Sequence, residues 1–225
     1  MGLPMLRDGP DRTMALARYR AMAAGYDATC ARIEAIRSAA VDALQLSPGD
    51  TVFDVACGTG PLLVQLARLV SPGGRVLGIE QSPEMADIAH ARVNRVGSRA
   101  SVSVLVAPVE DARPECVADA LLLSYTHDVL QNPAAVLNLL RHARPGAQVV
   151  ITGMRFLPWW WAAPLNLVVG YRARRYLSTY RGLRQPWAPL LPHCPDLKVV
   201  RTFHAGTSYL AVGTVGAAAP CCIAH

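Results

Sequence analysis

The chain has 225 residues, of which 52% are hydrophobic and 17% are charged, and its formal net charge is +6. This length fits one α/β domain with a sizeable core, and the hydrophobic content excludes a disordered chain. The segment between Met154 and Pro195 contains no Asp or Glu but six arginines, which equal the whole net charge: Arg155, Arg172, Arg174, Arg175, Arg181 and Arg184. The sequence therefore has one basic region and is otherwise neutral.

No segment has the features of a targeting signal or a membrane span. The most apolar run, residues 156–170, holds two prolines and falls short of the roughly 20 residues that a spanning helix needs. The six cysteines lack regular spacing, and the Cys/His group at 221–225 lacks the spacing of a structural zinc site. We therefore expect a cytoplasmic protein without a disulfide framework or a bound metal.

The predicted elements begin with helices. After an N-terminal arm at 1–11, the pattern is helical from 13 to 46, with a break near 25–27 and a turn at 47–50. Short apolar strands then alternate with helices; the strands are expected at 51–56, 75–80, 101–106, 118–124 and 147–152, and the helices at 61–70, 83–96 and 133–143. Ser82, followed by Pro83 and Glu84, is a good helix start, because it supplies a capping hydroxyl, a proline and an acid in the first turn.

The last two predicted strands follow a different pattern. Residues 197–203 and 207–214 are joined by only three residues, which is the spacing of an antiparallel hairpin. The earlier strands are apolar and separated by helices, which indicates a parallel sheet covered on both faces. The sequence therefore predicts an α/β fold with a doubly wound, mainly parallel seven-stranded sheet that ends in an antiparallel hairpin.

The stretch from Val52 to Gly60 predicts a nucleoside-binding loop. An apolar strand runs into small residues and then a helix, so the backbone can pass close to a ligand at the carboxyl end of the strand. Glu80 closes the next strand, where a carboxylate can accept hydrogen bonds from both ribose hydroxyls. A dinucleotide site requires a third glycine for its pyrophosphate, but Leu63 stands there; S-adenosylmethionine (SAM) has no phosphate and does not need that glycine.

Three segments carry a resemblance to a known family. Residues 54–60 (DVACGTG) resemble motif I of class I SAM-dependent methyltransferases, especially the small-molecule branch that includes ubiquinone/menaquinone C-methyltransferases. Residues 76–85 resemble the second motif of that family, and residues 144–147 resemble its Lys-Pro-Gly-Gly turn before strand five. The resemblance covers roughly residues 19–214. It implies the Rossmann-like methyltransferase fold, with SAM as the cofactor.

The resemblance also implies a division of the chain. Residues 1–46 are expected to form an N-terminal helical lid, and residues 47–215 the SAM-binding domain. Within that domain, an insert at 156–191 is expected to cover the substrate, and residues 216–225 are expected to form a flexible tail.

The cofactor-binding residues implied by the resemblance are Tyr19, Tyr26, Asp54, Ala56, Cys57, Gly58, Gly60, Glu80, Gln81, Met85, Val109, Glu110 and Ser124. The loop around Asp54 and Gly58 is implied to lie against the methionine part of SAM. Glu80 is implied to bind the ribose, with Gln81 and Met85 beside the adenine.

The same resemblance places Ser124 and Tyr125, at the end of the fourth strand, beside the sulfonium. It also places Tyr19 and Tyr26 on an N-terminal helix that closes over the cofactor.

Two positions depart from the family pattern. Ala56 replaces the usual first glycine of motif I. Pro108 stands where an aspartate commonly contacts the adenine amine, and proline has no N–H. The adenine contact must therefore come from Glu110, Asp111 or water.

The end of the fourth predicted strand supplies the catalytic candidates, Tyr125 and His127. Methyl transfer from a sulfonium mainly requires alignment and desolvation, with a base only when the nucleophile carries a proton. His127 is the candidate base, because a neutral imidazole can accept a proton near pH 7. The alternative is that His127 only packs beneath the insert. Asp128 either orients His127 or caps the next helix.

The insert contains over half of the aromatic residues of the chain and the basic region. The spacing predicts an amphipathic helix over 164–184, with Leu165, Val169, Tyr176 and Tyr180 on one side. Aromatic and arginine side chains together suit an apolar acceptor with an anionic group, such as a carboxylate or a phosphate. The alternatives to a pocket lid are a membrane-surface helix over 156–184 and a homodimer interface.

The sequence favours a SAM-dependent methyltransferase that acts on a small-molecule acceptor. One alternative is an RNA or protein methyltransferase, but no RNA-binding module is appended, and we expect no nucleic-acid partner. Another is a relative that binds SAM without transferring the methyl group. The acceptor, and whether its O, N, C or S atom is methylated, are left open.

Overall fold

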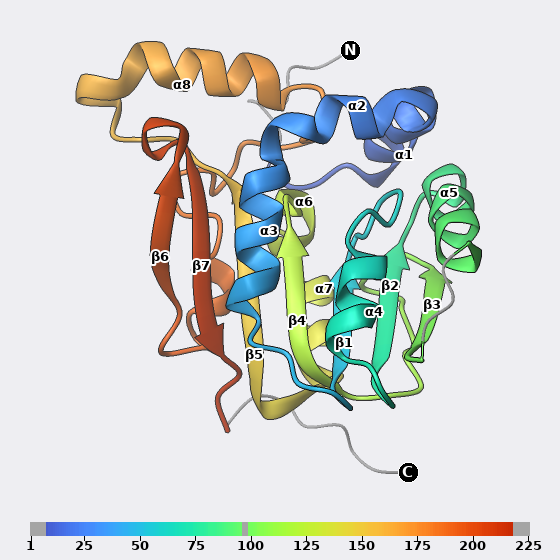
Figure 1. The fold of residues 1–225 in the computed structure, drawn as a ribbon. Helices are drawn as coiled ribbons and strands as arrows, with labels where there is room; N and C mark the ends of the chain where they lie inside the picture. Colours follow the sequence, from blue (N-terminus) through green and yellow to red (C-terminus); the bar gives the residue numbers. More distant parts are fainter. Residues whose placement is uncertain (1–7, 96–98, 218–225) are drawn as a thin grey trace.

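The computed structural model describes residues 8–95 and 99–217 and contains one seven-stranded sheet (Figure 1). The strands lie in the order β3-β2-β1-β4-β5-β7-β6. Their bounds are β1 (Thr51–Val55), β2 (Arg75–Glu80), β3 (Ser101–Val106), β4 (Ala118–Ser124), β5 (Ala143–Met154), β6 (Lys198–Phe203) and β7 (Ser208–Thr214). The predicted fold class is confirmed, including the antiparallel pairing of β7 with both β5 and β6.

The strand order creates the place for a ligand. β1 pairs in parallel with β2 on one side and with β4 on the other, so the chain reverses its direction of winding at β1. In an open α/β sheet, the carboxyl ends of two such strands form a crevice. All five residues of β1 are buried, which explains why this strand is a continuous apolar run apart from Asp54 at its exit and Thr51 at its start.

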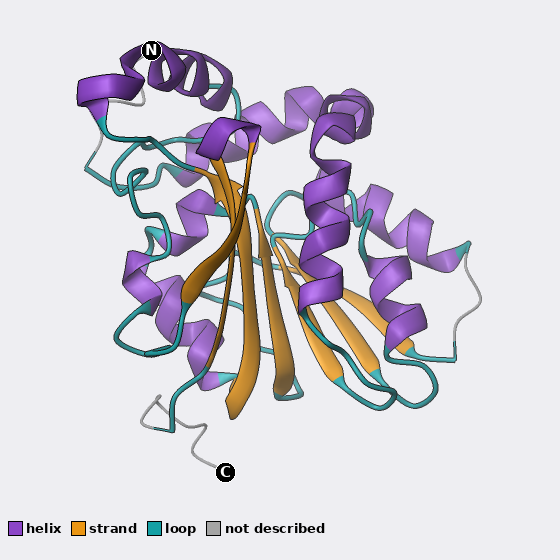
Figure 2. Cartoon of the chain, turned by 60° about the vertical axis from the view of Figure 1, so that its left-hand side comes forward, coloured by secondary structure: helices purple, strands orange, loops and turns teal. Residues whose placement is uncertain are grey.

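Helices cover both faces of the sheet (Figures 1 and 2). On one face lie α3 (Glu34–Ala43), α4 (Leu63–Leu69) and α5 (Pro83–Asn94), and on the other lie α6 (His127–Leu130) and α7 (Pro133–Arg141). Each face has its own apolar core cluster. The predicted start of α5 is confirmed, because the Ser82 hydroxyl accepts a hydrogen bond from the N–H of Met85.

The N-terminal helices lie above the carboxyl ends of the strands (Figure 1). They are α1 (Arg12–Met22) and α2 (Tyr26–Cys30), and short 3-10 turns at 23–25 and 31–33 interrupt the helical path. The first turn matches the predicted break near 25–27. Within the described part of the segment 1–46, which was expected as a lid, α1 and α2 lie over this edge, whereas α3 packs on the sheet through Ile36, Ala40 and Val41.

Two elements differ from their predicted bounds. β5 begins at Ala143, so it includes residues 144–147, which were predicted to form a turn before the strand. The register of the β4–β5 pairing shifts between Ala118 and Ala120, which accommodates these extra residues of β5. The predicted helix over 164–184 is wrong in both bounds. The helix observed is α8 (Trp159–Ala173). It has an additional first turn, which is joined at the non-helical residue Ala162 to the longer part that contains Pro164.

The insert also differs in which side chains it buries. Leu165 is exposed, whereas Tyr176 and Tyr180 lie after the end of α8 in a turn-rich segment. No helix in the described ranges is long and apolar enough to cross a membrane. The predicted tail falls mostly outside the described residues, which end at position 217.

Candidate functional site

The loop after β1 has the backbone conformation that its sequence predicts. Ala56, Gly58 and Gly60 all have positive φ values, of 52°, 59° and 70°. At Gly60 a Cβ atom would come within 2.8 Å of Leu63 and 2.9 Å of Ala89, so glycine is required there for helix packing. Ala56 adopts the left-handed region without that freedom, and such local strain is found mainly at functional sites.

Glu80, at the end of β2, fixes this loop from the neighbouring strand. Its two carboxylate oxygens accept hydrogen bonds from the N–H of Gly58 at 2.9 Å and from the N–H of Ser82 at 2.8 Å. Burial raises the pKa of Glu80, and the backbone N–H groups oppose this shift. Each carboxylate oxygen has a second lone pair, so Glu80 can still accept hydrogen bonds from a ligand in the cavity that it lines.

Three small cavities follow the strand ends around this loop. The first, of about 20 Å³, is lined by Arg37, Asp54 and the loop itself. The second, of about 60 Å³, is lined by Glu80, Met85 and the end of β4. The third, of about 90 Å³, contains Gln81, Val109 and Glu110. The three cavities share Ala56 as a lining residue and are together called the strand-end cleft below; their lining extends from Asp54 to Glu110.

Almost all of the predicted cofactor residues meet in the strand-end cleft. Twelve of them line it: Tyr19, Tyr26, Asp54, Ala56, Cys57, Gly58, Glu80, Gln81, Met85, Val109, Glu110 and Ser124. Gly60 does not line it and instead packs against α4 and α5. Of the alternatives for the adenine contact, Glu110 lines the cleft, whereas Asp111 is exposed outside it.

Arg37 and Asp54 lie together at one end of the cleft. Burial raises the pKa of Asp54 to about 7, although Arg37 lowers it. The Nε of Arg37 is buried and has no hydrogen-bond partner among the described residues. Buried donors are normally satisfied, so this guanidinium is available to an anionic group of a ligand. Sequence analysis missed Arg37; its signal was an arginine on the otherwise apolar buried face of a helix.

Three tyrosines form a wall above the centre of the cleft. The ring centroids of Tyr19 and Tyr26 are 6.0 Å apart, and those of Tyr26 and Tyr176 are 6.5 Å apart, both edge-on. The hydroxyl of Tyr19 donates to the carbonyl of Tyr176 at 3.2 Å. Tyr26 also lies against the glycine loop, 3.7 Å from where a Cβ of Gly58 would be. The tyrosine faces could therefore attract a cation bound in the cleft.

Polar contacts hold the N-terminal helices over the cleft. Asp27 accepts a hydrogen bond from Thr59 at 2.5 Å and pairs with Arg92 of α5, and Arg20 pairs with Glu84. The Thr59 hydroxyl and the α5 side chains belong to the elements that form the cleft.

The end of β4 holds the catalytic candidates. Tyr125 has a φ of 60°, which is unusual for a bulky residue and turns its side chain at the strand exit. The Tyr125 hydroxyl and both ring nitrogens of His127 are buried without a hydrogen-bond partner of good geometry among the described residues. Burial lowers the pKa of His127 to about 4, so its imidazole is neutral at pH 7. Tyr125 and His127 both line the strand-end cleft.

Asp128 bonds to Ser178 of the insert, whereas the sequence predicted that it orients His127 or caps the next helix. One of its oxygens accepts hydrogen bonds from the N–H of Ser178 at 2.9 Å and from the Ser178 hydroxyl at 2.6 Å, so it ties the insert to the end of β4. The other oxygen is buried and has no partner in the described part of the chain. Asp128 also lines the strand-end cleft, a role that the sequence did not predict.

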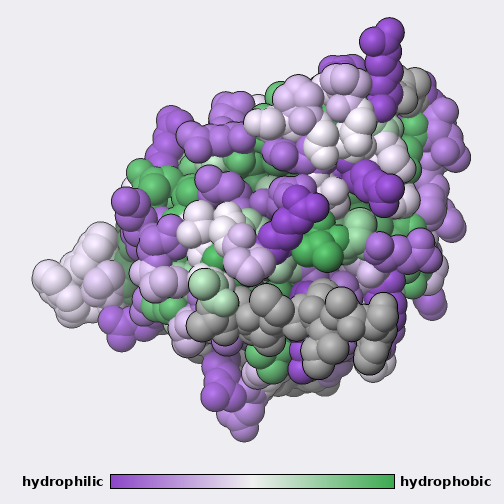
Figure 3. Space-filling model, turned by 90° about the horizontal axis from the view of Figure 1, so that it is seen from below, coloured by the Kyte–Doolittle hydropathy of each residue, from purple (hydrophilic) through white to green (hydrophobic). Residues whose placement is uncertain are grey.

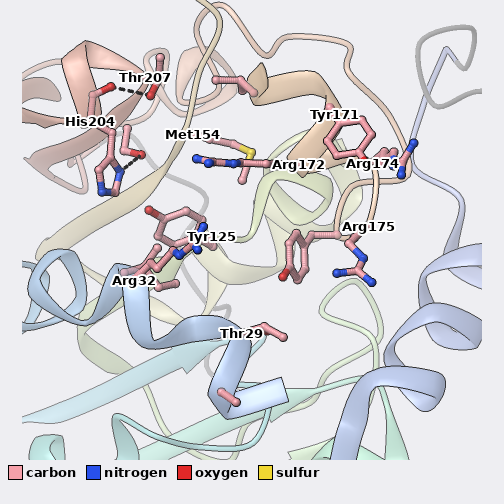
Figure 4. Close-up of a pocket in the computed structure, with 15 residues that line it drawn as sticks. Thr29, Arg32, Tyr125, Met154, Tyr171, Arg172, Arg174, Arg175, His204 and Thr207 are labelled. Carbon is pink, nitrogen blue, oxygen red and sulfur yellow. Dashed lines mark hydrogen bonds between the residues drawn. The ribbon is translucent and has the colours of Figure 1, made fainter. Parts of the chain in front are cut away.

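A larger cavity, of about 660 Å³, adjoins the cleft (Figure 4). Tyr125 and Tyr176 line both spaces. The remaining wall comes from segments far apart in the sequence: Ala28, Thr29, Arg32, Ile33, Met154, Val169, Tyr171, Arg172, Arg174, Arg175, His204, Thr207 and Ser208. The predicted hairpin turn thus contributes to the wall, where the Thr207 hydroxyl donates to the His204 carbonyl at 2.7 Å. No group of three or more metal-ligating side chains occurs within residues 8–95 and 99–217.

Comparison with known proteins identifies relatives of part of the chain. Residues 12–113 match the family model of protein-L-isoaspartate(D-aspartate) O-methyltransferase. An uncharacterized 37.1 kDa protein in transposon TN4556 of Streptomyces fradiae is 32% identical over 126 residues, which are 55% of this chain and 36% of that protein. The 2-phytyl-1,4-naphtoquinone methyltransferase of Synechococcus elongatus is 31% identical over 109 residues, 48% of this chain and 47% of that protein. The matched regions span less than half of these relatives.

Among solved structures, the N-methyltransferase NodS from Bradyrhizobium japonicum WM9, in complex with S-adenosyl-L-homocysteine (SAH), has a similar fold. The TM-score is 0.60, the identity is 14%, and the alignment covers 89% of this chain and 98% of that chain. At this identity the similarity establishes the fold alone.

Proposed function

We propose that the chain is a class I SAM-dependent methyltransferase that transfers the methyl group of SAM to a small, partly apolar acceptor with an anionic group. The observation that supports this most directly is the arrangement of the two spaces. The strand-end cleft and the 660 Å³ cavity share Tyr125 and Tyr176, so ligands in the two spaces would meet at these residues.

The residues of the strand-end cleft fit SAM. Glu80 would accept from the ribose hydroxyls with the lone pairs that Gly58 and Ser82 leave free. Arg37 would bind the carboxylate of the methionine part, and Asp54 its ammonium group, since both line the same end of the cleft. The unpartnered Nε of Arg37 is the observation that tests this fit, because a buried donor without a partner is otherwise costly.

The central and opposite parts of the cleft fit the rest of the molecule. The faces of Tyr19, Tyr26 and Tyr176 would stabilise a sulfonium cation. Gln81, Met85, Val109 and Glu110 would surround the adenine. When bound, SAM supplies an electrophilic methyl group, so the chain needs only to align the acceptor and exclude water.

The 660 Å³ cavity suits a small acceptor of mixed character. Its volume is typical of small-molecule sites, and Ile33, Met154 and Val169 provide apolar walls. Arg32 and Arg172 come from opposite walls, and Figure 4 shows both near Tyr125. Two guanidinium groups at one cavity favour a carboxylate or phosphate on the acceptor.

His127 is proposed as the proton acceptor for acceptors whose nucleophile carries a proton. It is neutral at pH 7, buried, and lines the strand-end cleft beside Tyr125. A pKa of about 4 makes it a weak base, so it suits a nucleophile that loses its proton as the methyl group arrives. The acceptor atom is not fixed by this arrangement.

The match to a protein-methylating family does not argue for a protein acceptor. That match covers residues 12–113, whereas Tyr125, Arg172 and the other later residues of the 660 Å³ cavity lie beyond it. It therefore concerns mainly the part of the chain that lines the strand-end cleft.

The decisive experiment follows SAH formation from SAM by the purified chain with a panel of quinones, phenols and lipids, each with and without a carboxylate or phosphate. We expect turnover with anionic amphiphiles, and Arg172→Gln should raise KM for these by about 10-fold without changing KM for SAM. Arg68→Gln, an exposed arginine on α4, is the matched control. SAM binding without SAH formation on any acceptor would indicate a non-methylating relative, and activity only on RNA or protein would also overturn the proposal.

A further inference from the structure

The outer surface of α8 is apolar and exposed. Seven large hydrophobic side chains of this helix are exposed: Trp159, Trp160, Trp161, Leu165, Leu167, Val168 and Tyr171. Trp160 is 87% exposed, Leu167 67% and Tyr171 65%. The other exposed large hydrophobic residues of the described chain, such as Leu69 and Leu137, are scattered over different elements. Contiguous apolar surface of this kind marks an interaction site.

The structure holds this surface in place. Leu167, Val168 and Tyr171 lie on the side of the helix opposite to Asn166, Val169 and Ala173, which are buried. Asn166 accepts from the N–H of Leu157 at 2.9 Å and donates to its carbonyl at 2.8 Å.

A second group of contacts braces the two ends of α8. Tyr180 donates to the carbonyl of Gly170, and the rings of Phe156 and Trp159 are in edge-on contact at 5.6 Å. The apolar residues of α8 are therefore presented outward by a well-anchored helix.

Positive charge accompanies the apolar surface. Arg172, Arg174 and Arg175 are exposed at the C-terminal end of α8, and no ion pair of theirs is found within the described ranges. Arg174 stacks on the ring of Tyr171 at 3.9 Å, and no acidic residue occurs from 155 to 195. A partner for this surface must offer negative charge next to apolar groups.

The position of α8 suits a flat partner. In Figure 1 it lies across one end of the molecule, beyond the hairpin of β6 and β7, and Figure 2 shows the same placement. The opposite end presents mainly hydrophilic side chains, with hydrophobic ones scattered among them (Figure 3). A planar surface can therefore contact α8 along its length.

We propose that the outer face of α8, with Arg174 and Arg175, docks onto a membrane surface that contains anionic lipids. Tryptophan side chains favour the boundary between head groups and acyl chains, and arginines pair with lipid phosphates. A second copy of the chain would cover the apolar area but would bring no carboxylate from its own insert to these arginines. The docking itself does not depend on the proposed methyl transfer.

One consequence does rest on the proposed function. Val169, Tyr171 and Arg172 of α8 also line the 660 Å³ cavity, so the docking face lies next to the cavity of the acceptor. A membrane-borne acceptor would then have a short path into the cavity.

Vesicle co-sedimentation of the full chain without SAM tests the docking. We expect binding to vesicles of phosphatidylcholine with about one third phosphatidylglycerol, much weaker binding to phosphatidylcholine alone, and a blue shift of tryptophan fluorescence on binding. Trp160→Ser combined with Leu167→Ser should lower the partition coefficient by at least about 10-fold. Leu69→Ser combined with Leu137→Ser, at exposed apolar positions away from α8, is the control that should bind like the wild type.

The charge is tested separately. Arg174→Gln combined with Arg175→Gln should reduce binding to the anionic vesicles by about 5-fold for each arginine, with little effect on residual binding to phosphatidylcholine. Circular dichroism confirms that each variant is folded. The proposal is overturned if the folded wild type binds neither vesicle, if the Trp160/Leu167 variant binds as well as the control, or if these substitutions instead abolish self-association measured by ultracentrifugation.

Discussion

The carboxylate of Glu80 accepts a hydrogen bond from the backbone N–H of Gly58, so the acid at the end of β2 fixes the glycine loop that follows β1. Its second oxygen serves the N–H of Ser82. Glu80 is therefore expected to act in two ways, as a ligand-binding group and as a support for the loop.

These two roles predict different effects of two substitutions. Glu80→Gln keeps one side-chain oxygen and should lower SAM affinity by about 10- to 100-fold in calorimetry, with a modest loss of stability. Glu80→Ala leaves two backbone N–H groups without their acceptor, and should also lower the free energy of unfolding by about 2–4 kcal/mol. Glu115→Gln, at an exposed position, is the control. Unchanged affinity in both Glu80 variants would show that the ribose assignment is wrong.

Substitution of Arg37 should lower the affinity for SAM while the protein stays folded. We expect Arg37→Gln to weaken SAM binding by about 10-fold or more, because a charge-assisted hydrogen bond to the methionine carboxylate is lost. The exposed Arg68→Gln should bind SAM normally. If Arg37→Gln binds SAM as the wild type does, the carboxylate is held elsewhere in the cleft.

Asp54 predicts a dependence of stability on pH in the ligand-free protein. Its pKa is raised by burial to about 7 in the folded chain, whereas an unfolded aspartate ionises near pH ~4. Between these values the unfolded state has lost a proton that the folded state keeps, so the contribution of Asp54 to stability should fall as pH rises from about 4 to 7.

The expected slope is up to about 1.4 kcal/mol per pH unit in the free energy of unfolding, followed by urea denaturation at several pH values. Glu80 and Asp128 also have raised pKa values from burial, so the wild-type slope contains their contributions too. The difference between the wild type and Asp54→Asn isolates the aspartate. Parallel pH profiles for the two proteins would show that Asp54 is ionised in the folded state.

The lowered pKa of His127 predicts that kcat changes little with pH near neutrality. Because its pKa is lowered by burial to about 4, kcat should change little between pH 6 and 8 through this residue. If His127 is the base, His127→Gln and His127→Ala should each lower kcat by about 100-fold or more while SAM affinity stays within about 3-fold. Nearly full turnover in both variants would leave His127 as a packing residue.

Features encoded by local sequence were predictable. The strand before the loop follows from the apolar run 51–55, and the cleft residues follow from the short motif around Gly58 and from Glu80. What could not be read locally depends on segments that meet only in the folded chain. Arg37 lies on a helix that reads as part of a lid, and Asp128 is bound by Ser178, 50 residues away.

The bounds of α8 show a second limit of sequence reasoning. Pro164 suggested the start of a helix, but a helical turn that begins at Trp159 precedes it. This turn is joined to the rest of α8 at the non-helical residue Ala162. Hydrophobic periodicity then assigned Leu165 to a buried side, although this helix leaves most of its large apolar side chains exposed. Periodicity reports burial only when a helix faces a single core.

Most of the wall of the 660 Å³ cavity comes from residues 169–176, at the end of α8 and just after it, and from residues 204–208 of the β6–β7 hairpin, with four more residues from 28–33. Glu80 and the glycine loop, in contrast, line only the strand-end cleft. Substitutions at His204 or Thr207 could therefore accumulate without disturbing the groups that grip the nucleoside. Such a division would let descendants of one ancestral gene change what they modify while retaining the same methyl donor.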